Sequence, residues 1–296
     1  MSCEVPEPGR LLNHLSRSLT NYSMIMPLQD IRLPISAPVR RSLCQQSMPA
    51  DDAPGRRILL SVMYLAVIVF TGMPAHAGQQ VFNSGEAQVT LLELYTSQGC
   101  NSCPPAERWL NAYVDSEALW EKTVPVVFHV DYWDYLGWKD TLADSAHAER
   151  QRNYARQGRA RTVYTPGMFV NGREWRGWTF RLPPRVSDRR PGNLAVTITD
   201  RQLAAVFRHS ADPLELHVAL LGFGIETSIE RGENRNRTLR QEFVVLSHAV
   251  HGAPGGRWRV PLPEVNDRHT GRRALAVWVS EPGNPVPLQA TGGWLD

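Results

Sequence analysis

The chain carries VTLLELYTSQGCNSCPPAE at residues 89–107, and this stretch decides how its central part folds. Residues 89–95 form a short, nearly continuous apolar run, which is typical of a strand buried on both faces. A polar turn leads to Cys100, and Pro104-Pro105 then fit the first turn of a helix, where a missing N–H costs nothing. The stretch therefore predicts a buried strand that turns directly into a proline-started helix, with a C-x-x-C motif at the junction.

The segments that follow predict the rest of a mixed α/β unit. A second apolar run at 124–130 is long enough for another buried strand, and the order strand, helix, strand implies a right-handed crossover and a parallel pair. A polar helix is expected at about 144–157. The strand expected at 163–170 ends at Asn171-Gly172, which is a strong hairpin signal.

The pattern changes in the last third of the chain. A further helix is expected at 200–209, and from residue 214 onward short apolar runs alternate with turns rich in Gly, Asn and Pro. The sequence therefore predicts an α/β domain over 78–210, followed by a smaller β-rich unit over 211–296.

The first 77 residues predict export rather than a folded domain. Residues 1–47 are rich in Pro without a sustained period, so we expect a disordered or mis-assigned extension with the true start at Met48. A pair of arginines precedes the uncharged apolar run at 58–70, and small residues precede a cleavage site after Ala77. Residues 48–77 are thus expected to be a signal peptide that sends the protein to the periplasm or outside the cell. An uncleaved anchor is the alternative.

Composition limits the function classes. The chain is 42% apolar and 21% charged, so it can bury a core. It contains no run of 18 or more apolar residues, which excludes a polytopic membrane protein. Its net charge is +3, but residues 78–296 hold 25 basic and 24 acidic side chains, which argues against a nucleic-acid partner. We expect no stable membrane span after cleavage of the signal, and the oligomeric state is left open.

Two of the four cysteines, Cys100 and Cys103, follow the expected signal peptide. A disulfide between residues so close in sequence constrains the unfolded chain very little, so a structural role explains the pair poorly. At a helix N-terminus, free N–H groups and the helix dipole favour an anion, which makes the first sulfur a nucleophile. Cys100 is therefore the candidate attacking thiol, and Cys103, one turn along, is the candidate resolving thiol.

A second feature of the chain, Thr165-Pro166, lies about 60 residues downstream at the start of an expected strand. With the C-x-x-C motif, it makes the chain resemble the thioredoxin superfamily, which pairs this motif with a cis-proline. The resemblance implies a thioredoxin-like α/β fold, with a central mixed sheet and flanking helices. It also implies that Pro166 faces the two sulfurs and that the Thr165 backbone pairs with an incoming peptide as an added strand. An ordinary trans-proline is the alternative.

Several separated motifs are similar to one family of secreted thioredoxin-like proteins of unknown function. They are residues 94–107, 129–138, 164–166, 170–172 and 231–237. This similarity spans about residues 85–290 and implies a fold and a redox pair without naming a substrate. The stretch 181–193, rich in Arg and Pro, is interpreted as an insertion.

Three polar residues are candidates for supporting the redox pair. The resemblance implies that a buried acid at Glu93 shuttles the proton of Cys103, and the alternative is a carboxylate paired with an arginine or a backbone group. His129 and Asp131 share one face of the second strand. A role beside the sulfurs is favoured over a metal site that these two residues would build with both cysteines, because the spacing is not that of a known zinc module.

Aromatic residues are candidates for binding substrate. Trp133, Trp138, Trp175 and Trp178 lie in two segments expected to flank the redox site, and they could form an apolar rim that grips an extended peptide. Tyr164 is a further candidate for substrate binding. Packing in the core is the alternative. The charged stretch 231–237 is expected to be a solvated hairpin turn, and the family resemblance leaves open the alternative that it contacts the active face.

The residues together predict a thiol–disulfide oxidoreductase that needs no cofactor. It would exchange disulfides with protein or small-molecule partners through Cys100 and Cys103, in a direction that the sequence leaves open. One alternative is a module that binds Cu(I) or Zn through the same thiolates. The other is a non-catalytic binding protein whose cysteines are vestigial.

Overall fold

The computed structural model describes residues 3–4, 78–264 and 271–296, which belong to one compact unit. Apart from Cys3–Glu4, the expected extension at 1–47 and the expected signal peptide at 48–77 lie outside the described residues. Among the described helices, none is long and apolar enough to cross a membrane.

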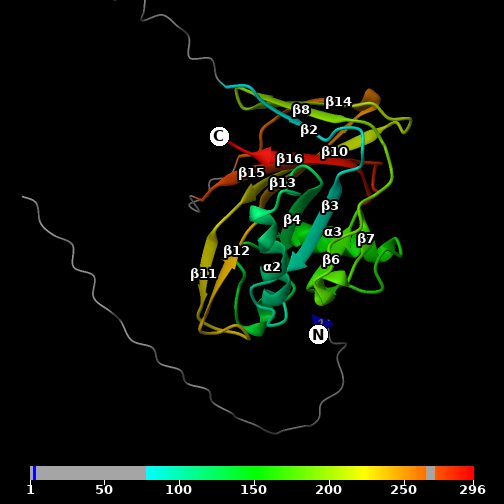
Figure 1. The fold of residues 1–296 in the computed structure, drawn as a ribbon. Coiled ribbons are helices and arrows are strands. Elements are labelled where there is room, and N and C mark those ends of the chain that lie inside the picture. The colour runs from blue at the N-terminus through cyan, green and yellow to red at the C-terminus, as the bar shows by residue number, and fades with distance from the viewer. Residues whose placement is uncertain (1–2, 5–77, 265–270) are drawn as a thin grey trace, which may run out of the picture. The chain divides into compact units, whose positions relative to one another are not determined.

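A mixed eight-stranded sheet forms the main layer, in the order β16-β15-β10-β13-β4-β3-β6-β7 (Figure 1). Its strands in chain order are β3 (Thr90–Thr96), β4 (Thr123–His129), β6 (Gly167–Val170), β7 (Arg173–Glu174), β10 (Leu214–Gly222), β13 (Val244–Ala253), β15 (Arg273–Ser280) and β16 (Pro287–Trp294). Strand β4 runs parallel to β3 on one side and to β13 on the other, and the remaining neighbours are antiparallel. Strands from before and after residue 210 therefore complete a single sheet.

The elements around the C-x-x-C motif follow the local sequence pattern. All seven residues of β3 and all seven of β4 are buried, as their apolar runs predict. Helix α2 (Pro104–Asn111) begins directly after Cys103 and carries prolines in its first turn. Helix α3 (Ser145–Arg156) is capped by Asp144, whose side chain accepts a hydrogen bond from the Ala146 N–H. The predicted strand–helix–strand unit with a parallel pair is confirmed.

A second, four-stranded antiparallel sheet covers one face of the main sheet. It consists of β2 (Gln80–Asn83), β8 (Leu194–Thr199), β9 (Gln202–Phe207) and β14 (Arg257–Pro261), in the order β14-β9-β8-β2. Alternate side chains of β10 and β15, including Leu216, Val218 and Val277, pack against it in one apolar cluster. Successive residues of these strands point to opposite faces, so the neighbouring side chains face the core around β3 and β4 instead.

The helix expected at 200–209 is wrong, because this segment is strand β9. Asp200 and Arg201 both have positive φ angles, of 47° and 62°, and make the tight turn that joins β8 to β9. The side chains of β9 then alternate between buried and more exposed, which is the period of a strand at the surface of a core.

The expected thioredoxin-like α/β fold with flanking helices is also wrong. The described residues are mostly β-sheet, with 42% in strands and 16% in helices, and α2 and α3 are the two α-helices among them. The physical reason lies after residue 193. The segments there pair with one another and with β4, so they widen the main sheet and build a second one instead of covering the first with helices.

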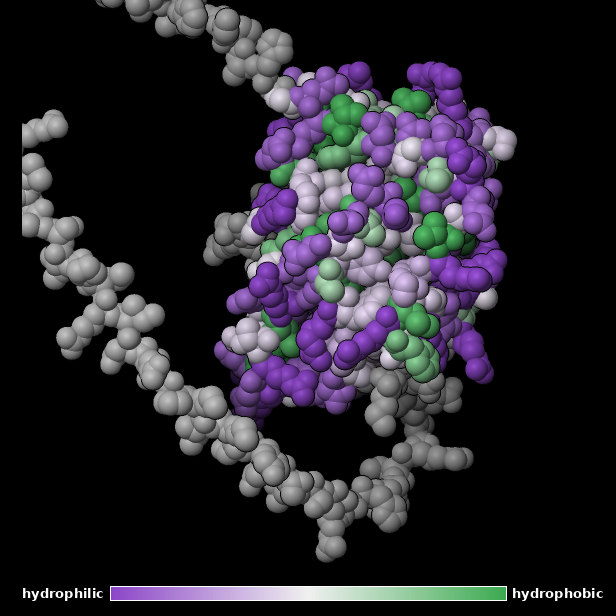
Figure 2. Space-filling model, viewed as in Figure 1, coloured by the Kyte–Doolittle hydropathy of each residue, from purple (hydrophilic) through white to green (hydrophobic). Residues whose placement is uncertain are grey.

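The remaining elements are short. They comprise β1 (Cys3–Glu4), β5 (Tyr164–Thr165), β11 (Ile225–Ile229), β12 (Arg237–Gln241) and the 3-10 turns η2 (Ala112–Asp115), η3 (Asp134–Leu136), η4 (Gly177–Phe180) and η5 (Pro254–Gly256). Strands β11 and β12 form a hairpin, and β1 pairs antiparallel with β5 so that Cys3 lies opposite Thr165. The face of the molecule shown in Figure 2 is largely hydrophilic, with apolar residues in several small separate groups.

Candidate functional site

The two cysteines lie where β3 passes into α2, and their thiols are in contact. The Cys100 N–H donates to the Ser97 carbonyl at 3.1 Å, and the Cys103 N–H donates to the Cys100 carbonyl at 3.3 Å. This tight turn leads directly into α2, with Cys103 at its N-cap. Burial raises the pKa of Cys103 well above its ordinary value, and a hydrogen bond with the Cys100 thiol raises it further. The pair therefore has the geometry that thiol–disulfide exchange requires, in which one sulfur lies within reach of the other.

The Cys100 thiol faces the backbone of β5. Its Sγ lies 4.0 Å from the Thr165 carbonyl oxygen and 3.2 Å from Ser102 Oγ, and the Thr165–Pro166 peptide is cis. A side chain at Gly167 would come within 2.8 Å of the Tyr164 carbonyl, so the chain can bend this closely only with glycine after the proline. Cys100 is 1% exposed, with β1 running along β5 beside it.

A buried acid that sequence reasoning missed, Glu107, lies one helical turn after Cys103. Residues four apart share a helix face, and the Glu107 side chain is 4% exposed. The Thr96 hydroxyl donates to Glu107 Oε1 at 2.6 Å, and a hydrogen bond with Thr96 also acts on the Cys103 thiol. Burial raises the pKa of Glu107 above its ordinary value, although the charge of His129 opposes this. The Thr96 hydroxyl thus links the resolving thiol to a carboxyl that can exchange a proton.

His129 lies at the end of β4 and pairs with Asp140. Its Nδ1 is 2.7 Å from Asp140 Oδ2, and both side chains are fully buried. Burial acts to lower the pKa of His129, but the charge and hydrogen bond of Asp140, together with the charge of Glu107, raise it. Burial acts to raise the pKa of Asp140, but the charge and hydrogen bond of His129, together with the N–H groups of Gln98 and Leu142, lower it. Asp140 also accepts the Gln98 N–H at 2.8 Å, which ties the pair to the loop before Cys100. Asp131 lies in the loop after β4, where its carbonyl accepts the Asp134 N–H.

The Glu93 carboxylate is paired with an arginine, which is the alternative that the sequence left open to proton transfer with Cys103. Its carboxylate forms a buried ion pair with Arg150 of α3, at 3.0 Å from Nε, and also accepts the hydroxyls of Tyr95 and Tyr154. These bonds satisfy the carboxylate in the core. The acid that acts on Cys103 through Thr96 is Glu107.

The candidate aromatic residues have different partners. Trp133 is buried and donates its Nε1–H to Thr165 Oγ1 at 2.7 Å, which fixes the strand that faces Cys100. Trp138 donates to Gln98 Oε1 at 3.0 Å and so supports the redox loop. Tyr164 is buried and donates its hydroxyl to Glu174 at 2.6 Å. Of the three, Trp133 and Trp138 contact segments that adjoin the redox pair.

The loop at 231–237 is exposed at most of its residues, as expected of a solvated turn, and it also contacts the redox motif, which is the alternative that the resemblance left open. Asn234, between β11 and β12, is 0% exposed and donates hydrogen bonds to the carbonyls of Gln98 and Cys100. It lies 134 residues from Cys100, so nothing in the local sequence pattern could indicate this contact. For Glu107, by contrast, the four-residue spacing from Cys103 was an available signal.

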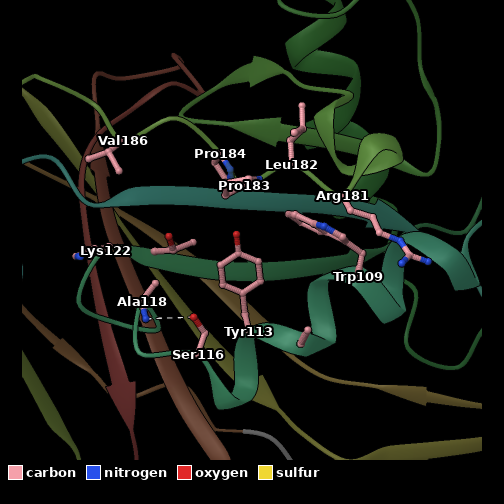
Figure 3. A pocket seen from close by; sticks show the side chains of 12 residues that line it. Trp109, Tyr113, Ser116, Ala118, Lys122, Arg181, Leu182, Pro183, Pro184 and Val186 are labelled. Atoms are coloured by element: carbon pink, nitrogen blue, oxygen red, sulfur yellow. Dashed lines mark hydrogen bonds between the residues drawn. The ribbon is translucent and has the colours of Figure 1, made fainter.

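Two further features bear on what the described residues can bind, namely the arrangement of metal-ligating side chains and a groove beside α2. Among the residues that the structure describes, no group of three or more His, Cys, Asp or Glu side chains could hold a metal ion. A groove of about 420 Å³ lies along the outer side of α2, between Trp109 and Tyr113 on one side and Pro183 and Pro184 on the other (Figure 3). The first residues of the stretch interpreted as an insertion, 181–193, therefore form one wall of this groove.

Comparisons with known proteins give a family. No curated protein matches the chain. Two solved structures are similar to it. The protein AGR_C_4864 from Agrobacterium tumefaciens is 24% identical, with a TM-score of 0.49 over 71% of this chain and 95% of that one. HBP35 of Porphyromonas gingivalis is 13% identical, with a TM-score of 0.43 over 72% of this chain and 77% of that one. Residues 91–280 match the family described as protein of unknown function (DUF1223), which is more than half of the sequence. The chain therefore belongs to the DUF1223 family.

Proposed function

We propose that the protein is a thiol–disulfide oxidoreductase that works through Cys100 and Cys103. The observation that carries this proposal is the contact between the two thiols at the start of α2, with Cys100 Sγ 4.0 Å from the carbonyl of the cis Thr165–Pro166 peptide. The likeness to thioredoxin-superfamily enzymes is proposed for this local arrangement and its chemistry, and not for the architecture around it.

The exchange proceeds in two displacements. The Cys100 thiolate attacks one sulfur of a substrate disulfide, so that a mixed disulfide forms and the other substrate sulfur leaves as a thiolate. The Cys103 thiolate then attacks Cys100 Sγ, which forms the Cys100–Cys103 disulfide and releases the second substrate thiolate. The substrate gains two electrons and the protein loses two; the reverse sequence oxidises a substrate dithiol.

The second displacement requires that Cys103 lose its proton in a buried place. The hydrogen bond with Thr96 favours the Cys103 thiolate, whereas burial disfavours it. We assign Glu107 as the proton acceptor, because the Thr96 hydroxyl bonds to its carboxyl at 2.6 Å. The raised pKa of Glu107 suits this role, since a base works best when its pKa lies closer to the working pH.

The substrate proposed for this site is an extended segment that carries a disulfide. The pairing of β1 with β5 indicates that the backbone edge of Tyr164–Thr165 has room for an added strand next to Cys100. Trp133 holds the Thr165 side chain from the other side. We propose protein partners of this kind in the periplasm or outside the cell, as the expected signal peptide implies.

Trapping tests the proposal. A Cys103→Ser variant cannot release the mixed disulfide and should accumulate covalent adducts with a disulfide-bonded peptide, visible by non-reducing electrophoresis and mass spectrometry. The matched Cys100→Ser variant lacks the attacking thiol and should form none. Equal adduct formation by both variants, or none by either, would overturn the proposal.

A further inference from the structure

The tip of the β11–β12 hairpin, residues 230–236, closes over the redox motif from the C-terminal part of the chain. Gly232 has a φ of +74°, and a Cβ there would lie 3.2 Å from the Leu136 carbonyl and 3.3 Å from Trp138 Cβ. The tip therefore packs closely against the segment at and after η3, and a side chain at residue 232 would press against this segment. Gln98 is tied to the hairpin as well, because its Nε2 donates to Thr227 Oγ1 on β11 at 3.1 Å.

Asn234 fixes the backbone on both sides of Gly99. Its Nδ2 donates to the Gln98 carbonyl at 2.9 Å and to the Cys100 carbonyl at 2.8 Å, and its Oδ1 accepts Arg237 at 3.0 Å. Because two carbonyls surround Nδ2 and a guanidinium meets Oδ1, the amide can take only this orientation. A buried amide with these bonds acts as a rigid support for Cys100.

Glu233 places a carboxylate at the helix end that should favour a thiolate. Its Oε2 accepts the N–H of Asn101, the residue after Cys100, at 3.1 Å. Backbone N–H groups at this end of a helix normally stabilise a nearby anion. Asn101 lies in the turn before α2, whose first two residues are prolines without N–H groups. The Glu233 carboxylate takes up the N–H of this turn and adds a negative charge, which opposes part of the stabilisation that the start of α2 gives a Cys100 thiolate.

We propose that the hairpin tip, through Asn234 as a support and Glu233 as a charge, biases Cys100 and Cys103 toward their disulfide form, so that the protein reduces disulfide substrates. The inference rests on the proposed function and assigns it a direction. A dithiol whose reduced form is stabilised is an oxidant, and a reduced form that is destabilised makes a reductant. In each cycle two electrons pass from the dithiol to a substrate disulfide, and a dithiol donor must then reduce the Cys100–Cys103 disulfide again.

The charge can be removed with little change in shape. In Glu233→Gln the side-chain carbonyl can still accept the Asn101 N–H, whereas the negative charge is lost. Glu107 and Tyr132, two further titratable groups whose charges are coupled to the sulfurs, remain in place. The matched control is Glu230→Gln, which removes an exposed carboxylate from the same hairpin tip.

The experiment measures the equilibrium between the Cys100–Cys103 dithiol and the oxidised and reduced forms of dithiothreitol, at pH 8, by acid trapping and mass spectrometry. Glu233→Gln should lower the constant for disulfide formation in the protein about tenfold, which corresponds to a potential higher by about 30 mV. Glu230→Gln should stay within twofold of the unmodified protein. Asn234→Ala, checked for folding by circular dichroism, should also lower this constant, and an unchanged constant in the folded variant would remove Asn234 from the inference.

The outcomes separate the two proposals. If Cys100 and Cys103 form no disulfide under any dithiothreitol ratio, the proposed function fails, and the inference fails with it. If the disulfide forms but Glu233→Gln leaves the constant unchanged, raises it, or shifts it no more than Glu230→Gln does, the function stands and the inference is overturned.

Discussion

Replacing Glu107 by Gln should slow the resolving step while leaving the first attack intact. The side chain is 4% exposed, and the Thr96 hydroxyl that bonds to it at 2.6 Å also acts on the Cys103 thiol. Glutamine keeps the size and can still accept the Thr96 hydroxyl, but it cannot take up a proton. The variant therefore isolates proton transfer from packing.

The expected slowing of the resolving step follows from the burial of Cys103. Burial raises the pKa of this thiol well above its ordinary value, so without an acceptor only a small fraction is thiolate at neutral pH. Positioned bases contribute about 10²–10⁴-fold to a proton-transfer step. Because the Thr96 hydroxyl remains beside the thiol in the variant, we expect the lower end of this range, a loss of about 100-fold.

A single-turnover assay separates the two steps. The unmodified protein and Glu107→Gln are mixed with a disulfide peptide that carries a fluorophore, and acid-quenched samples give the formation and decay of the mixed disulfide. Formation should be unchanged, and decay should slow about 100-fold and lose its dependence on an ionisation at the raised pKa of Glu107. The exposed Glu149→Gln on α3 is the control. Decay at the normal rate in folded Glu107→Gln would refute the reasoning.

Three further predictions concern stability and access. Glu93→Gln leaves Arg150, 10% exposed, as a buried charge without its partner, so urea titration should show a loss of about 3–5 kcal/mol; a loss below about 1 kcal/mol would contradict this. The pKa of His129 is raised, so its pairing with Asp140 contributes stability that is fully present below pH ~6.5 and lost as pH rises through the raised value. The lowered pKa of Asp140 makes its share present above pH ~3.9 and lost as pH falls through the lowered value. His129→Asn should flatten the alkaline loss in thermal melts across pH, and an unchanged profile would count against the pair. A chain beginning at residue 78 lacks the β1 strand along β5, so Cys100, 1% exposed with β1 present, should react faster with iodoacetamide than in the full chain.

The sequence predicts those elements whose causes are local. Strand β3 and the start of α2 follow from an apolar run and two prolines, and Asn171 and Gly172 take the positive φ angles that their hairpin needs. The segment 202–207 contains good helix formers but pairs as β9, because burial of alternate side chains against β10 and β15 outweighs its local preference. The expected fold class is wrong because the later strands pair with segments distant in sequence, and a local pattern does not show such pairing.

The candidate site likewise combines residues placed by neighbouring elements with residues placed by distant ones. Cys100 and Cys103 are positioned by elements adjacent to them in sequence, and they lie where the motif indicates. Asn234 and Glu233 reach them across more than 130 residues, through a hairpin whose own sequence is merely charged. Their contribution depends on how the chain closes, which the motif alone does not contain.

The different reactivity expected of the two thiols can be measured in one experiment. In the reduced chain beginning at residue 78, the pH dependence of iodoacetamide alkylation can be followed separately at Cys100 and Cys103 by peptide mass spectrometry. We expect Cys100 to react at a pH well below the value of ~8.5 for an ordinary cysteine, because the start of α2 stabilises its thiolate, while Cys103, 0% exposed, stays unmodified. Alkylation of both thiols together, and only at alkaline pH, would contradict this expectation.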